Sequence, residues 1–232
     1  LCDRRQRQMC IRDSYIAAED TRNTVKLLNH FNIEAKLISH HEHNLHVAIP
    51  KLLSLLEEGE PVALVSDAGY PAISDPGYEM VLATIDAGYN VVPLSGCNAC
   101  LDALVVSGIA PQPFMFYGFL SHTNKNKTKE LEKLKNITYT IVFYEAPHRI
   151  KATLECMMKV LGDRRIALCR EITKKHEEIL RGTISEVLEV VDELKGEMVI
   201  VVEGGAEVTE EVTFDQTITC LLYTSPSPRD TR

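Results

Sequence analysis

Short apolar runs alternate with amphipathic segments along the first half of the chain. Runs of four or five mainly apolar residues, typical of buried strands, cover 15–18, 35–39, 61–65 and 91–94. Between and after them, apolar residues recur with helical spacing in 21–31, 47–56, 78–87 and 99–106. Strands that alternate with helices predict a parallel sheet. We therefore expect this half to be an α/β domain.

The pattern resumes after 108–113, a stretch that contains Gly108, Pro111 and Pro113 and that we interpret as a domain boundary. Strands are expected at 114–118, 138–144, 165–169, 179–182 and 197–204, and helices at 150–161 and 185–194. The sequence thus predicts two α/β domains, 15–111 and 112–205, followed by a tail at 206–219.

The two ends do not share this pattern. Residues 1–14 and 220–232 show neither helical nor strand periodicity. Both resemble translated sequencing adapters, so we interpret them as non-native segments and exclude them from the prediction of fold and function. The genuine protein is then expected to be a fragment that lacks both of its natural ends.

Composition favours a globular protein of the cytoplasm. The chain is 45% hydrophobic, which is enough for a core. It has neither an apolar run near the roughly 18 residues of a membrane span nor a basic and apolar leader, so we expect no membrane partner.

Charge argues against non-specific binding of nucleic acid, because the formal net charge is −8. Positive charge is concentrated at 122–135, which contains five lysines: Lys125, Lys127, Lys129, Lys133 and Lys135. A solvated helix face is the common explanation of such a run, and a patch that binds a nucleic-acid backbone is the alternative.

The stretch 66–77 (SDAGYPAISDPG) links an expected strand to an expected helix. Glycine permits a positive φ and the close approach of a ligand, whereas proline fixes φ and removes a donor. Asp75 or Ser74 is well placed to cap the next helix, with Pro76 near its first position. The stretch is longer than an ordinary strand-to-helix connection. It therefore predicts a ligand site at the carboxyl edge of the sheet.

Polar residues follow two further strands. Residues 95–99 (SGCNA) form a second strand-to-helix turn, which should open on the same edge of the sheet as 66–77. Residues 19–22 (EDTR) follow the run 15–18. They form either part of a site or a capping box with a surface salt bridge.

Two groups of residues raise the question of a metal or redox site. Four histidines and Glu42 occur within 40–46, without a clear metal-binding spacing. Cys97 and Cys100 have redox spacing but lack a second pair. A polar or solvated loop and packed, reduced thiols are the simpler interpretations, so we expect no metal.

Six motifs together resemble one family. They are 17–22 (AAEDTR), 66–77, 93–96 (PLSG), 143–149 (FYEAPHR), 170–174 (REITK) and 196–199 (GEMV). The chain resembles the ribosomal RNA small subunit methyltransferase I family of the tetrapyrrole methylase superfamily. The resemblance implies a parallel-sheet N-terminal domain and a mixed-sheet C-terminal domain, with S-adenosylmethionine (SAM) between them. It also implies a homodimer and 2′-O-methylation of a cytidine in small-subunit rRNA, met as free RNA or in the 30S subunit.

The resemblance also implies site residues. SAM offers a carboxylate for helix N-termini and an adenine and ribose for backbone groups. We expect its contacts among Asp67, Ala68, Gly69, Ile73, Ser74, Asp75, Leu94, Gly96 and Ala99. Catalytic candidates near the RNA are Glu19, Arg22, Glu145 and Lys174. Of these, Lys174 or Glu19 is expected to lie nearest the ribose.

This sequence departs from the family pattern in three places. The adapter-like segment replaces a first strand and its Thr-Pro-Ile-Gly-Asn-Leu-type loop, Tyr70 replaces a threonine, and 95–98 replaces Pro-Gly-Pro. Two alternatives therefore remain open. One is a C-methyltransferase of tetrapyrroles, and the other is an inactive fragment that binds SAM or RNA.

Overall fold

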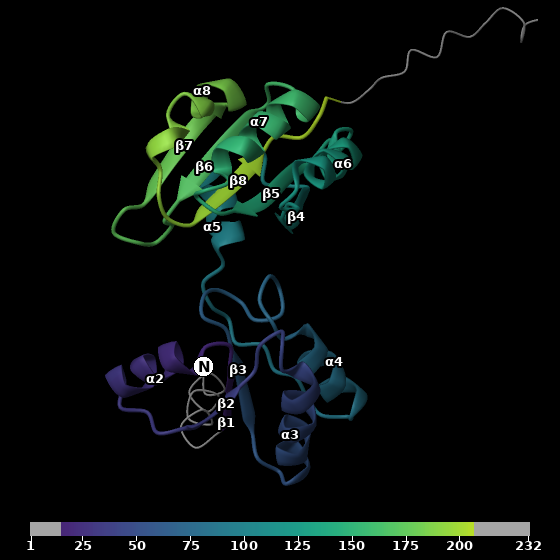
Figure 1. The fold of residues 1–232 in the computed structure, drawn as a ribbon, viewed down its shortest axis with the longest axis vertical. Helices are drawn as coiled ribbons and strands as arrows, with labels where there is room; N and C mark the ends of the chain where they lie inside the picture. The colour runs from purple at the N-terminus through teal and green to yellow at the C-terminus, as the bar shows by residue number, and fades with distance from the viewer. Residues whose placement is uncertain (1–14, 207–232) are drawn as a thin grey trace, which may run out of the picture.

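The computed structural model describes residues 15–206, which form two lobes (Figure 1). The segments interpreted as non-native, 1–14 and 220–232, lie outside the described residues, as does the tail from residue 207 onward. Both lobes combine a sheet with helices. The predicted α/β fold with a parallel and a mixed sheet is confirmed.

The N-terminal lobe is built on three parallel strands. β1 (Tyr15–Ala18) lies between β2 (Lys36–Ser39) and β3 (Val62–Val65). Its helices are α2 (Thr21–His30), α3 (Leu45–Glu57) and α4 (Tyr78–Asp86). Ala17, Ile38, Leu52 and Met80 pack together in its core. Because the strands are parallel, the chain leaves all three at one edge, which places the segments after residues 18, 39 and 65 side by side.

The prediction of a strand at 91–94 is wrong. The segment is not a strand, and its apolar side chains are about half exposed. A strand needs a neighbour for its backbone hydrogen bonds, and none of the described strands pairs with this segment. Pro93 also lacks a backbone donor. An apolar run alone cannot supply the missing neighbour.

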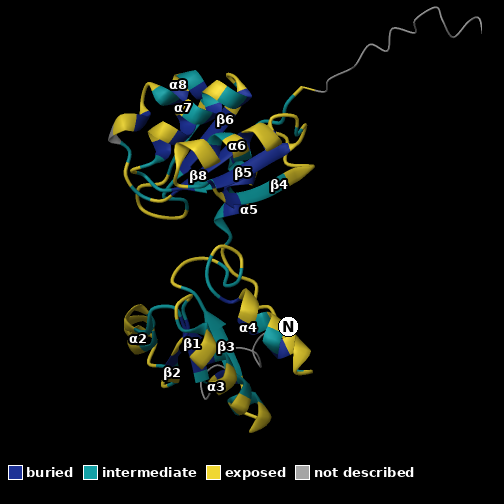
Figure 2. Ribbon diagram, turned by 45° about the vertical axis from the view of Figure 1, so that its right-hand side comes forward, coloured by how far each residue is buried: buried dark blue, intermediate teal, exposed yellow. Residues whose placement is uncertain are grey.

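The C-terminal lobe contains a five-stranded mixed sheet in the order β4-β5-β8-β6-β7. The strands are β4 (Phe114–Phe119), β5 (Thr140–Glu145), β6 (Arg165–Arg170), β7 (Glu178–Thr183) and β8 (Met198–Val202). β4 and β5 are parallel, whereas β8 pairs antiparallel with both β5 and β6. β5, β6 and β8 carry most of the buried residues of the sheet (Figure 2).

Helices cover both faces of this sheet. α6 (Asn124–Leu134), α7 (Ile150–Leu161) and α8 (Ile184–Leu188) pack on one face around Phe143 and Ile200, and the short 3-10 helix η2 (Val191–Glu193) follows. The helix expected at 185–194 is therefore shorter: α8 ends at Leu188, and a turn at 189–190 separates it from η2.

The opposite face of the sheet is covered by α5 (Ala99–Ser107). Ala103 and Leu104 of α5 pack against Ala167 and Val201. α5 precedes the boundary predicted at residue 111, yet it lies on the C-terminal sheet (Figure 1). Within residues 15–206, no helix combines the length and the apolar character needed to cross a bilayer.

Candidate functional site

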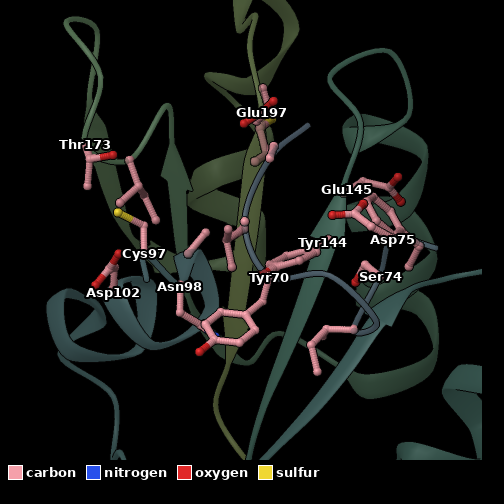
Figure 3. Close-up of a pocket in the computed structure, with 18 of the residues that line it drawn as sticks. Tyr70, Ser74, Asp75, Cys97, Asn98, Asp102, Tyr144, Glu145, Thr173 and Glu197 are labelled. Atoms are coloured by element: carbon pink, nitrogen blue, oxygen red, sulfur yellow. The ribbon is translucent and has the colours of Figure 1, made fainter. Parts of the chain in front are cut away.

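A cavity of about 470 Å³ lies between the two lobes (Figure 3). Its wall comes from the loop after β3, the start of α5, the ends of β4 and β5, the segment after β6 and the start of β8. The lining residues are Ala68, Gly69, Tyr70, Ile73, Ser74, Asp75, Cys97, Asn98, Ala99, Asp102, Phe119, Tyr144, Glu145, Ala146, Pro147, Ile172, Thr173, Lys174, Glu197, Met198 and Val199. Cavities of this size hold small molecules and cofactors.

The loop 66–77 forms the wall contributed by the N-terminal lobe. Ala72 has φ 66°, which is costly for a residue with a side chain. Gly77 has φ 148°, and a Cβ there would lie 2.9 Å from Leu64 Cδ2. Glycine is therefore required where the loop passes β3.

The start of α5 forms a second wall. Asn98 caps this helix, since its side-chain oxygen accepts a hydrogen bond from Leu101 N at 3.1 Å. Cys97, Ala99 and Asp102 line the cavity from the same turn. A helix N-terminus carries partial positive charge and unpaired backbone N–H groups, which suit an anionic group of a ligand.

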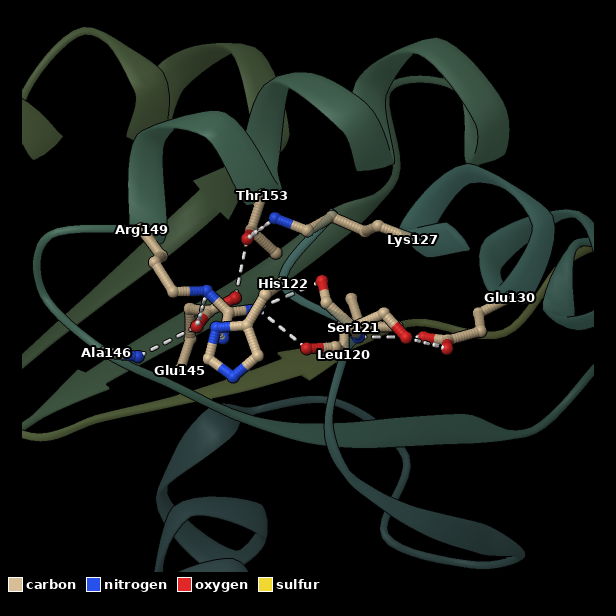
Figure 4. A network of polar contacts seen from close by, with 9 residues as sticks. All are labelled: Leu120, Ser121, His122, Lys127, Glu130, Glu145, Ala146, Arg149 and Thr153. Atoms are coloured by element: carbon tan, nitrogen blue, oxygen red, sulfur yellow. Dashed lines mark hydrogen bonds and ion pairs between the residues drawn. The ribbon is translucent and has the colours of Figure 1, made fainter. Parts of the chain in front are cut away.

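Glu145 lies at the third wall of the cavity and is held there by a network of polar contacts (Figure 4). Its Oε1 accepts a hydrogen bond from Ala146 N at 2.9 Å and lies 3.2 Å from Arg149 Nε. Its Oε2 accepts a hydrogen bond from the Thr153 hydroxyl at 2.5 Å, and Lys127 Nζ donates to that hydroxyl at 2.7 Å. Because its side chain is only 1% exposed, Glu145 holds the turn 145–149 in place.

The segment after β6 is strained and charged. Glu171 has φ 50° and Thr173 has φ 64°, although neither is glycine. Such backbone strain concentrates at functional sites. Lys174 Nζ donates hydrogen bonds to Glu171 Oε1 at 3.1 Å and to Glu197 Oε2 at 2.8 Å. The bond to Glu197 raises the pKa of Lys174, so at neutral pH this residue is a fixed cation in the cavity wall.

Two carboxylates of the lining remain without an ion-pair partner among residues 15–206. Asp75 comes from the N-terminal loop and Asp102 from α5 (Figure 3). Burial raises the pKa of Asp75. The cavity therefore presents negative charge on two of its sides, in addition to the paired groups Glu145, Glu197 and Lys174. A ligand that carries a positive charge suits this arrangement.

Many of the predicted site residues lie in this lining. They are Ala68, Gly69, Ile73, Ser74, Asp75, Ala99, Glu145 and Lys174. Two others border it, because Tyr70 Oη donates a hydrogen bond to Leu94 O at 2.5 Å and the Tyr70 ring lies beside Gly96.

Three predicted residues lie elsewhere, on a neighbouring polar rim at the carboxyl edge of the N-terminal sheet. Glu19 Oε2 is 3.5 Å from Asp67 N, and Asn23 Nδ2 donates to Asp67 Oδ2 at 2.9 Å. Arg22 pairs with Asp20 at 2.7 Å and holds the pKa of that carboxyl at about 2. Asp20 also caps α2, so the helix cap and the surface salt bridge expected at 19–22 are confirmed, although the cap is a single side-chain bond to Arg22 N and not a capping box. None of these side chains lines the cavity.

Several lining residues escaped prediction, chiefly Phe119, Tyr144, Asp102 and Glu197. Tyr144 and Glu197 lie inside motifs that had been singled out, but their strand pattern indicated only sheet positions. Phe119 and Asp102 carried no local signal. They reach the site because β4 pairs with β5 in the C-terminal sheet and α5 packs on a face of that sheet.

The histidines of 40–46 and the pair Cys97 and Cys100 were considered above as metal or redox candidates. His40 is buried at 1% exposure with Nε2 unpaired, and burial lowers its pKa. Cys97 is exposed and Cys100 is buried, and both are free thiols. Within 15–206, no three side chains of the ligand type are placed to hold a metal ion.

Comparison with known proteins identifies the family. The family model of the tetrapyrrole (corrin/porphyrin) methylases matches residues 3–188. The chain is 55% identical over 208 residues to the ribosomal RNA small subunit methyltransferase I of Bacillus subtilis, which covers 88% of the chain and 71% of the relative. The chain belongs to this methyltransferase family. A relative of the same name from Synechocystis is 46% identical and covers 82% of the chain and 69% of the relative.

Solved structures show the same fold at low sequence identity. A cobalt precorrin-4 methyltransferase superposes with a TM-score of 0.60 at 14% identity, over 84% of this chain and 86% of that one. A uroporphyrin-III C-methyl transferase from Thermus thermophilus, complexed with S-adenyl homocysteine, superposes with a TM-score of 0.53 at 16% identity, over 83% and 97%. The two-lobed architecture is thus that of the tetrapyrrole methylases.

Proposed function

We propose that the chain transfers a methyl group from SAM to the 2′-oxygen of a cytidine ribose in small-subunit ribosomal RNA. The observation that carries this proposal is Lys174, a cation fixed by two carboxylates in the wall of a cavity between the lobes. The relatives named as small-subunit rRNA methyltransferases support the class of substrate.

The residues present fit SAM as the cofactor. The volume of about 470 Å³ suits a molecule of this size. Asp75 and Asp102 place negative charge where a sulfonium and an amino group would be stabilised, and the start of α5 suits a carboxylate. Ala68, Gly69, Ile73, Ser74 and Ala99 supply backbone groups and close packing. SAM would bring a methyl group that is already activated by its sulfonium.

The chain then has to hold the acceptor oxygen in line with that methyl group. Alignment of two bound reactants supplies much of the acceleration of such a step. Lys174 keeps its proton at neutral pH, so it donates a hydrogen bond to the ribose rather than acting as a base. The proton that the 2′-hydroxyl loses on methylation would pass to solvent water. Glu145 has both carboxylate oxygens occupied, so it positions the wall 145–147. Glu19 and Arg22 contact RNA from the polar rim.

The test is methyl transfer to undermethylated small subunits, with labelled SAM and the full chain. After digestion to nucleosides, the label should appear in 2′-O-methylcytidine. Label in a methylated base would contradict transfer to the ribose 2′-oxygen. Label in a precursor corrin but not in RNA would reveal a tetrapyrrole C-methyltransferase. Absence of transfer, together with absence of heat on titration with SAM, would identify an inactive fragment.

We also propose that the chain acts as a homodimer, as its family resemblance implies. Light scattering should give twice the mass of the chain, and the mass of a single chain would overturn this assembly.

A further inference from the structure

The lysine-rich run at 122–135 divides into two parts in the folded chain. Lys127 is 1% exposed and belongs to the buried network beneath the cavity. Lys125, Lys129 and Lys133 are exposed, and they recur at intervals of four along α6. Residues four apart lie on one helix face, about 6 Å apart along the axis. The three ammonium groups therefore form a stripe, which we call the α6 lysine stripe.

The stripe differs from several other cations of the C-terminal lobe, because those cations are paired with carboxylates. Lys151, Arg170 and Lys174 each have a carboxylate partner within 3.1 Å. Among residues 15–206 no ion pair involves a lysine of the stripe. On the same helix, Glu130 is held by Ser121, and Glu132 remains the exposed carboxylate beside the stripe. A positive face thus persists on a chain of net charge −8.

An exposed aromatic residue connects this face to the cavity. Phe119 ends β4, lines the cavity and is 54% exposed, although its ring also contacts Tyr144 edge-on at 5.6 Å between centroids. Lys125 follows six residues later. Arg149 donates to Leu120 O at 2.7 Å, and Glu130 accepts from Ser121 N at 3.0 Å. These bonds fix the connection between Phe119 and α6 (Figure 4).

An exposed aromatic ring together with a row of exposed cations is a combination that binds single-stranded nucleic acid. Lysines neutralise successive phosphates without reading sequence, and a base that is turned out of its stack can lie on an aromatic face. We propose that Phe119 and the α6 lysine stripe form the surface that docks the RNA substrate. The stripe holds the backbone while Phe119 stacks on a base at the mouth of the cavity. This assignment rests on the proposed function.

RNA affinity tests the stripe directly. The full chain is titrated into a labelled single-stranded fragment of small-subunit rRNA, and anisotropy gives Kd over a range of salt. We expect the triple change Lys125→Gln, Lys129→Gln and Lys133→Gln to weaken binding by about tenfold or more and to reduce the salt slope by about 2. The matched control is Lys26→Gln, Lys51→Gln and Lys159→Gln, which alters net charge equally at exposed sites outside the stripe. Equal effects of the two triples would overturn the proposal.

Two single changes sharpen the test. Glu132→Gln removes the carboxylate beside the stripe, so it should strengthen RNA binding, and weaker or unchanged binding would count against the stripe. Phe119→Ala should weaken RNA binding by about fivefold to a hundredfold. Because Phe119 also lines the cavity, calorimetry with S-adenosylhomocysteine measures its contribution to cofactor binding separately, and the loss of RNA affinity should exceed any loss of cofactor affinity. A loss of cofactor affinity with unchanged RNA affinity would overturn the assignment of Phe119 to the RNA.

The outcomes separate this surface from the proposed function. Methyl transfer to RNA with the same KM for wild type and for the stripe variant would support the proposed function and contradict the proposed RNA surface. RNA binding that depends on the stripe, without any methyl transfer to RNA, would support the proposed surface and contradict the proposed function.

Discussion

The hydroxyl of Tyr70 donates a hydrogen bond to the carbonyl oxygen of Leu94, 2.5 Å away. This bond joins the loop 66–77 to the segment 91–98, which is not part of the sheet. Both border the cavity between the lobes. A side chain thus supplies the link that strand pairing would otherwise provide.

The first prediction concerns this link. Tyr70→Phe removes one hydrogen bond and keeps the ring, so affinity for S-adenosylhomocysteine should fall about two- to tenfold in calorimetry. Tyr78→Phe is the control, because Tyr78 is 61% exposed and begins the helix after the loop. An equal loss in both variants would show that the bond to Leu94 does not shape the site.

A second prediction concerns Lys174. Lys174→Gln removes the cation from the cavity wall, so kcat for methyl transfer should fall about 10²- to 10³-fold while affinity for the cofactor is kept. Lys175→Gln is the matched control, because Lys175 is the exposed neighbour outside the lining. Single-turnover assays with saturating RNA measure both variants. An active Lys174→Gln enzyme would exclude the assigned role.

The pH dependence of the same residue can be predicted with its sign. Glu197 raises the pKa of Lys174 above 10.5, so the cation and its ion pairs are fully present below that value. They are lost only as pH rises through the higher pKa of the folded state. The ratio of wild-type to Lys174→Gln turnover should therefore stay constant from about pH 7 to 9. If wild-type turnover rose or fell with pH within that window and turnover of the variant did not, Lys174 would be identified as a base.

The buried network beneath the cavity gives a prediction about stability. Glu145→Ala removes the carboxylate that pairs with the mostly buried Arg149 and that reaches the buried Lys127 through the Thr153 hydroxyl, so the free energy of unfolding should drop by about 3–5 kcal/mol. Adding Lys127→Met should recover part of this loss, because it removes one uncompensated charge. Urea titrations measure both. Glu132→Ala, at an exposed position, should change stability by at most about 0.5 kcal/mol.

Thiol labelling provides a further prediction. Burial raises the pKa of Cys100 and of Cys169 to about 11, so both remain protonated and slow to react near pH 8. Cys97 is exposed and lines the cavity, so it should be alkylated faster than either and be protected by S-adenosylhomocysteine. Peptide mass spectrometry can follow each site. Labelling of Cys97 that is unaffected by the ligand would place the cofactor elsewhere.

Much of the fold follows from local patterns. The apolar runs at 15–18 and 61–65 are strands, as their pattern predicted, and they pair with each other. The loop 66–77 contributes to the cavity wall because its glycines and prolines exclude regular structure. Asp20 caps α2, as its position predicted. The cap expected from Asp75 or Ser74 is wrong, because α4 begins later, at Tyr78, with Gly77 before it and without a side-chain cap.

Tertiary packing decided the rest. Whether the run 91–94 became a strand depended on a partner, which no apolar pattern encodes. Among the lysines of 122–135, Lys127 is buried and Lys129 is exposed because α6 turns one face to α7. Lys174 became a fixed cation through Glu197, which is 23 positions away in the sequence.

By itself, the sequence determined most of the secondary structure, the turn chemistry of the site loops and the resemblance to a family, because each depends on neighbouring residues or on ordered motifs. Only the tertiary structure decided which charges are paired, which are buried and which face the cavity between the lobes. Those properties depend on distances between segments that are remote in the chain. The interaction energy of two charges varies with their separation and with their exposure to water, and the fold alone sets both.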